Sequence, residues 1–279
     1  MKKKLSALFL ALCFPFLYLL VRTVVPAAAY AAALARARER SPGLEEEWLR
    51  NQATLSVRAA APWLLIGSAL LTLLIVFLVF RLFKTPLKRI FGEGRLRPIT
   101  SFTLLELGLG LNIALGSMIV LLPLPETWHS EHTDKVGDPL AAAGWFALFF
   151  CTVIAAPLVE EVIFRGLCLR FLRQGFSEPM AVLWQAVLFA AFHGTKLQMV
   201  YVLPAAIILG LVYLWCRTLW APLILHMAFN AASLLPIPAS GSVYGKLAWL
   251  TAGAAITFLG LRGVYLRRAA SIAPGGNPA

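Results

Sequence analysis

The chain has 279 residues, 60% of them hydrophobic, and a formal net charge of +12 at pH 7. Its mean hydropathy of +0.79 is too high for an ordinary soluble domain, so we expect a membrane protein. The length suits one polytopic bundle and leaves no room for a large soluble domain beside it. No basic, aromatic-interleaved soluble face is present to bind nucleic acid, so the excess of Lys and Arg is read as a topology signal.

The N-terminal region begins with three lysines and continues with an apolar run from Leu5 to about Val25, broken only by Arg22. A signal peptide cleaved among the alanines after Pro26 is one interpretation. The run is longer than a usual signal-peptide core and contains Pro15, so we favour an uncleaved first span. Residues 26–58 carry arginines and glutamates of mixed sign and predict an amphipathic or solvated helix.

Apolar windows that could cross a bilayer recur along the whole chain. They lie at about 5–25, 59–83, 101–123, 140–169, 179–194, 200–216, 220–236 and 246–264. This pattern predicts an all-α, polytopic transmembrane bundle of about eight spans. We divide it into a variable N-terminal transmembrane region with three spans (1–135), a helical core that carries the motifs below (136–240), and a last span with a disordered Pro/Gly-rich tail (241–279).

The distribution of charge predicts the topology. Lysines and arginines gather at the N-terminus, between the second and third windows, and after the fourth, sixth and eighth windows, whereas the connection near 126–138 is acidic. We therefore expect an integral membrane protein with both termini in the cytoplasm. The four cysteines are far apart in or beside apolar runs and form no metal or CxxC pattern, so we expect small buried hydrophobic side chains.

The first polar motif is the segment from Glu160 to Gly166, which reads EEVIFRG. On a helix, Glu161 and Arg165 are i,i+4 neighbours and can pair, whereas Glu160 is rotated by about 100° and is free to face a cavity as a general base. A helix at the membrane surface with both glutamates solvated would give the same letters. Ionisable groups within a span are costly and usually functional, which favours the first interpretation.

Two further motifs follow in later windows. Phe189 to His193 reads FAAFH, in which the histidine alone could be structural. His226 and Asn230 are i,i+4 neighbours, so both side chains leave one helix face and could donate hydrogen bonds to an oxyanion or join helices as polar glue. Counted from the flanking arginines and Pro179, the three motifs lie at similar depth, and we expect them to converge in the middle or cytoplasmic half of the bundle.

Together these residues resemble the CAAX prenyl protease and bacteriocin-processing (CPBP, or ABI) family, whose signatures EExxxR, FxxxH and HxxxN/D all occur between residues 157 and 235. The resemblance implies an intramembrane endopeptidase. It implies that Glu160 and His193 activate water, that His226 and Asn230 form the oxyanion site, and that Glu161 and Arg165 support them. The implied substrate is a membrane-anchored or lipidated protein or peptide within the bilayer, such as a prenylated C-a-a-X tail.

The resemblance leaves the cofactor open. We favour no metal, because HExxH is absent and asparagine is a poor zinc ligand. If zinc is bound, we expect Glu160, His193 and His226 as its ligands.

Two other functions are alternatives to the endopeptidase. A non-catalytic membrane scaffold or immunity protein would need no complete set of motif residues. A transporter or proton relay would need further polar stations on both sides of the site, and Glu106 is the main extra candidate.

Overall fold

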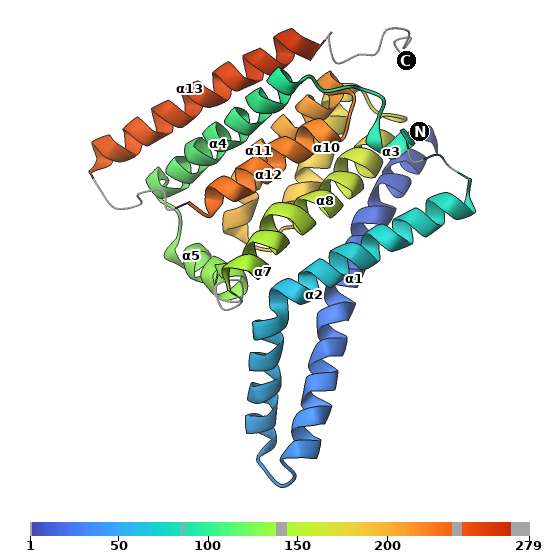
Figure 1. Cartoon of the computed structure of the whole chain (residues 1–279), viewed down its shortest axis with the longest axis vertical. Coiled ribbons are helices and arrows are strands. Elements are labelled where there is room, and N and C mark those ends of the chain that lie inside the picture. Colours follow the sequence, from blue (N-terminus) through green and yellow to red (C-terminus); the bar gives the residue numbers. More distant parts are fainter. Residues whose placement is uncertain (1, 85, 87, 138–143, 236–241, 269–279) are drawn as a thin grey trace.

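The computed structural model describes residues 2–84, 86, 88–137, 144–235 and 242–268, and within these it consists of helices without a named strand. The long elements, in chain order, are α1 (Lys2–Arg40), α2 (Glu46–Leu82), α4 (Pro98–Leu121), the continuous series α7 (Trp145–Phe149), η2 (Phe150–Ala155), α8 (Ala156–Glu161), η3 (Val162–Leu169) and α9 (Arg170–Leu172), then α10 (Glu178–Ala191), α11 (Lys196–Cys216), α12 (Trp220–Ser233) and α13 (Val243–Arg267). Short connections contain α3 (Lys88–Phe91), α5 (Glu126–His132) and the π-helical η1 (Thr133–Gly137). The predicted all-α polytopic bundle is confirmed (Figure 1).

The predicted spans correspond to helices of two lengths. Among the described residues, six stretches are long and apolar enough to cross a membrane: α1, α2, α4, the α7–α9 series, α11 and α13. The two remaining windows are the 14-residue helices α10 and α12. Fourteen residues rise about 21 Å, short of a hydrocarbon layer of about 30 Å, so α10 and α12 end inside the bundle. His193 follows two residues after the end of α10, whereas α12 carries His226 at its middle and Asn230 in its last turn.

Residues 26–58 do not form a separate helix, because they continue α1 and α2 into a long hairpin that turns at 41–45. Figure 1 shows the two arms side by side and extending away from the other helices. Glu46 pairs with Arg38 of the first arm and, at 3.2 Å, with Arg50 of its own helix. Pro26 and Pro62 lie inside the two helices, and proline is the usual cause of the bend that α2 shows in Figure 1.

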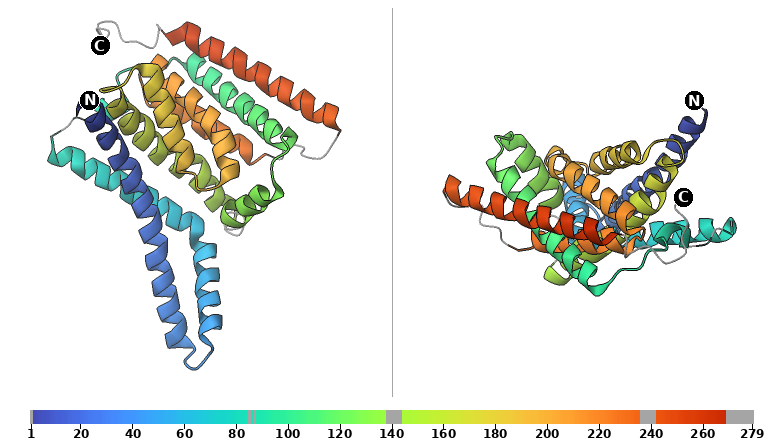
Figure 2. Two further views of the ribbon diagram at one scale, coloured as in Figure 1. Left: turned by 180° about the vertical axis from the view of Figure 1, so that it is seen from behind. Right: turned by 90° about the horizontal axis from the view of Figure 1, so that it is seen from above.

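The central layer surrounds η3, whose residues are all buried. The first half of α1 packs against η3 and α9, and α10 and α11 cover other sides of η3. On the far side, α4 is sandwiched between α12 and α13 (Figure 2). Glycines permit this close approach: a Cβ at Gly108 would lie 2.6 Å from the Leu225 carbonyl oxygen, and one at Gly253 would lie 2.5 Å from the Ala114 nitrogen.

One end of the bundle is tied by backbone contacts. Gly92 forms an isolated bridge with Thr218, Gly94 N–H donates to the Arg217 carbonyl oxygen (3.0 Å), and Leu219 N–H donates to the Phe91 carbonyl oxygen (2.8 Å). These bonds fix α3 beneath the turn between α11 and α12. The predicted disordered tail after Ala270 lies outside the described residues.

Candidate active site

A buried relay links the first and third motifs. Arg165 Nη1 donates to Glu161 Oε1 at 2.7 Å, and both side chains are fully buried, as the i,i+4 spacing predicted. The same Glu161 oxygen accepts a hydrogen bond from His226 Nδ1, also at 2.7 Å. Arg165 also lies over the Phe189 ring, 4.3 Å from its centroid. The pair therefore fixes the orientation of the His226 ring.

The remaining nitrogen of His226 faces Glu160. His226 Nε2 lies 3.8 Å from Glu160 Oε2, too far for a direct hydrogen bond and close enough for one atom of a substrate or water to contact both. Because Nδ1 already carries the proton shared with Glu161, Nε2 can donate only when the ring holds a second proton. The carboxylates of Glu161 and Glu160 stand on the two sides of this ring.

His193 lies just beyond the end of α10, and its Nε2 is a hydrogen-bond acceptor, whereas that of His226 is a potential donor. Its Nδ1 is 2.8 Å from the Phe189 carbonyl oxygen, which can only accept, so Nδ1 carries the proton. In the neutral ring, Nε2 is then a bare acceptor. The Phe189 ring holds this orientation edge to face, with its centroid 4.6 Å from that of His193. Phe189 thus orients a residue on each side of it, Arg165 and His193.

Asn230 is anchored across to the fourth apolar stretch. Its Nδ2 donates to the Thr152 carbonyl oxygen at 2.8 Å. Thr152 lies in the π-helical segment η2, where the i→i+4 pattern of an α-helix is interrupted and carbonyl groups become available for other partners. An amide group has two N–H bonds, so one of them remains for a ligand.

The four predicted catalytic residues line one cavity of about 800 Å³. Glu160, His193, His226 and Asn230 reach it from α8, the end of α10 and α12. Glu161 and Arg165 are absent from its lining and lie behind it in the core. The two neighbouring glutamates therefore separate as their helical rotation predicted, with Glu160 facing the cavity and Glu161 facing the protein.

Among the polar residues of the cavity that were not assigned a role from the sequence are Arg22, Asn112 and His132. Arg22 lies 5.3 Å from the Tyr18 ring centroid and forms no ion pair within the described part of the chain. Asn112 donates from Nδ2 to the Phe229 carbonyl oxygen (3.0 Å), while its buried Oδ1 has no partner among the described groups. Arg22 and Asn112 lie within apolar windows, and a polar group inside a predicted span is the sequence signal that could have identified them. His132 lies outside the windows and gives no such signal.

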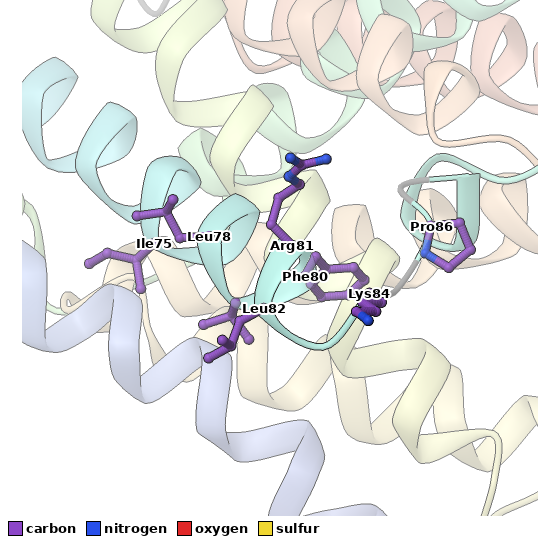
Figure 3. A pocket seen from close by; sticks show the side chains of 8 residues that line it. Ile75, Leu78, Phe80, Arg81, Leu82, Lys84 and Pro86 are labelled. Carbon is purple, nitrogen blue, oxygen red and sulfur yellow. The ribbon is translucent and has the colours of Figure 1, made fainter.

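A second pocket, of about 970 Å³, lies against the C-terminal end of α2 (Figure 3). Leu78, Phe80 and Leu82 line it together with Arg81 and Lys84. It contains neither a carboxylate nor a histidine, so it offers no group for proton transfer.

The predicted ligands of the zinc alternative are Glu160, His193 and His226, which all line the cavity. Among the described residues, no three His, Cys, Asp or Glu side chains are grouped as metal ligands. His226 Nδ1 is occupied by Glu161, and Nε2 is the only nitrogen of that ring left for another partner. We therefore derive no step through a metal.

Comparison with known proteins found a family-model match. Residues 142–232 match the family model described as Type II CAAX prenyl endopeptidase Rce1-like. No curated protein and no solved structure matches the chain. The matched stretch contains all three motifs, and the resemblance noted from them is confirmed.

Proposed function

We propose that this protein, whose residues 142–232 match the family model described as Type II CAAX prenyl endopeptidase Rce1-like, hydrolyses a peptide bond near the C-terminus of a membrane-anchored or lipidated protein. The family supports an intramembrane endopeptidase. The observation that carries the finer proposal is the shared cavity, in which a carboxylate, a histidine acceptor and two amide or imidazole donors face the same space.

In this proposal Glu160 and His193 activate water. His193 Nε2, bare because Nδ1 bonds to the Phe189 carbonyl, accepts a hydrogen bond that orients the water, and Glu160 takes its proton. The water oxygen forms a bond to the scissile carbonyl carbon, and the carbonyl oxygen becomes an oxyanion. When the C–N bond breaks, the proton on Glu160 passes to the leaving amine, so the carboxylate is regenerated.

His226 and Asn230 are the proposed oxyanion donors. With a second proton on its ring, His226 donates from Nε2, and Asn230 donates through the N–H that Thr152 does not use. Glu161 and Arg165 are positioning residues, because they act through His226 without reaching the cavity. Loss of one such oxyanion donor costs about 10²–10³-fold in turnover in well-studied hydrolases.

The cavity also offers groups for the substrate. Its wall is largely apolar, which suits the side chains or lipid of a membrane-anchored segment. Arg22 can bind the substrate's terminal carboxylate.

A mass-spectrometric cleavage assay in liposomes tests the proposal. It compares wild type, Glu160→Gln and Glu106→Gln on prenylated C-a-a-X peptides and on membrane-anchored C-terminal tails. Glu106 is an exposed carboxylate within α4 that does not line the cavity, so its variant is a matched control. We expect wild type and Glu106→Gln to cleave and Glu160→Gln to be folded and inactive. Folded wild type without activity on either class would favour the non-catalytic scaffold or immunity function.

A further inference from the structure

The two ends of the bundle differ in charge. The helices alternate in direction, so one end gathers the start of α1, the connections α2–α4, α9–α10 and α11–α12, and the end of α13, as Figure 1 shows. We call this end the basic face; its described lysine and arginine side chains are Lys3, Lys4, Arg81, Lys84, Lys88, Arg95, Arg97, Arg170, Arg173, Arg217, Arg262, Arg267 and Arg268.

The opposite end carries the α1–α2 hairpin, α5, η1 and the start of α13 (Figures 1 and 2). Here positive and negative charges are mixed: the hairpin carries both arginines and glutamates, α5 and η1 contain Glu126, Glu131 and Asp134 beside Lys135, and Lys196 and Lys246 lie in the first turns of α11 and α13. Short basic connections remain in the cytoplasm during insertion, so the basic face is the cytoplasmic one and this end lies outside.

The catalytic cavity is closed toward the basic face. Between Glu160 and that face lies η3, whose Ile163, Arg165 and Leu167 are fully buried. The short helix α3 covers η3 from outside: Ile90 is buried, and its Cγ2 would lie 2.6 Å from a Cβ added at Gly166. The backbone bonds between α3 and the α11–α12 turn hold this cover in place.

The same cavity is open toward the hairpin end. Its lining continues from Glu160 to residues inside the two long helices of the hairpin, Pro26, Val57 and Ala61, and to residues at or near the outer ends of other elements: His132, Lys135, Gln198, Ser233 and Leu235. Several of these are exposed, with Leu235 at 61% and the Lys135 side chain at 59%. The two arms of the hairpin supply part of this rim, through Pro26 on α1 and through Val57 and Ala61 on α2.

We infer that the cavity takes its substrate from the face of the membrane opposite the basic face. The assignment of a substrate rests on the proposed endopeptidase function, whereas the position of the opening does not depend on it. It assigns as substrate the membrane-anchored C-terminal region of a polypeptide already translocated to the outer side. A C-a-a-X tail presented from the cytoplasm would meet the closed layer of η3 and α3.

Cysteine labelling tests the opening without requiring activity. The full chain, with its four native cysteines replaced by alanine, receives either Ser233→Cys at the rim or Ser177→Cys, an exposed serine of the α9–α10 connection on the basic face. A membrane-impermeant maleimide is added to right-side-out and to inverted membrane vesicles. We expect Ser233→Cys to react only in right-side-out vesicles and Ser177→Cys only in inverted vesicles.

The labelling has two results that overturn the inference. Reversed sidedness of the two cysteines would show that the opening faces the cytoplasm. Reaction of Ser177→Cys from one side with no reaction of Ser233→Cys from either side, although a small permeant maleimide reacts fully with denatured protein, would show that the rim is covered.

A cleavage experiment then separates this inference from the proposed function. Peptides that carry a membrane-anchoring segment are added to the outside of each vesicle type, with Glu160→Gln vesicles as blank. Cleavage in right-side-out vesicles alone supports both ideas. Cleavage in inverted vesicles alone keeps the protease and overturns the access route. Sided labelling with no cleavage in either vesicle type keeps the opening and removes the substrate assignment together with the proposed function.

Discussion

Replacing the buried Arg165 should lower the thermal stability of the protein far more than replacing an exposed arginine that forms a similar ion pair. Arg165 and Glu161 are fully buried, 2.7 Å apart, and Glu161 also holds His226. Arg165→Met keeps much of the side-chain volume and leaves a buried carboxylate without its cation. Breaking a buried pair in this way costs about 3–5 kcal/mol. At about 2–4 °C per kcal/mol for a chain somewhat shorter than this one, Tm should fall by about 6–20 °C.

Arg173 provides the matched control, because it forms an ion pair with Glu178 in which the two side chains are 38% and 57% exposed. Such exposed pairs contribute up to about 1 kcal/mol, so Arg173→Met should lower Tm by no more than about 4 °C. The assay is intrinsic-fluorescence thermal unfolding in one detergent. A Tm loss in Arg165→Met no larger than that in Arg173→Met would refute the reasoning.

A double variant tests the cause of the loss. Glu161→Gln removes the stranded charge and keeps an oxygen that can accept from His226 Nδ1. Glu161→Gln/Arg165→Met should therefore have a higher Tm than Arg165→Met alone, because its buried groups are neutral. Equal or lower stability of the double variant would mean that Arg165 acts through its contacts with Phe189 and the Ala206 carbonyl instead.

Three further outcomes follow from the cavity. Arg22→Gln should raise KM by about tenfold or more for peptides with a free C-terminal carboxylate, because a charge-assisted hydrogen bond contributes about 1.5–3 kcal/mol. The KM for peptides with an amidated C-terminus should stay unchanged. Equal changes in KM for both kinds of peptide would exclude the contact between Arg22 and the carboxylate. Burial, with a smaller effect of neighbouring His129, lowers the pKa of His132, so its stabilising contribution is present above about pH 6.5 and is lost as pH falls below that value. The Tm of wild type should then decline more steeply than that of His132→Gln between pH 7 and 5, and parallel curves would contradict this. Incubation with EDTA should not change cleavage, whereas a loss that Zn²⁺ restores would make Glu160, His193 and His226 ligands.

Much of the fold was predictable because hydropathy is a local property of the chain. Within the described residues, each of the eight windows overlaps a helix or the α7–α9 series, and the Glu161–Arg165 pair follows from i,i+4 spacing alone, although the segment is π-helical from Val162. The separation of Glu160 from Glu161 follows from helical rotation in the same way. For residues 26–58, the sequence predicted only a charged helical segment. It did not predict the hairpin, because the extension of α1 and α2 into this segment depends on packing between the two arms.

The sequence by itself determined the class of the protein, its helices and the three motifs, since composition and periodicity are local quantities. Only the tertiary structure decided which partners those motifs meet: Glu161 with His226 from 65 residues away, Asn230 with the Thr152 carbonyl from 78 residues away, and Arg22 of the first helix inside the cavity. It also decided which end of the cavity is open. The physical reason is that burial and hydrogen-bond partners depend on how helices distant in sequence pack, and one chain's local pattern does not contain that information.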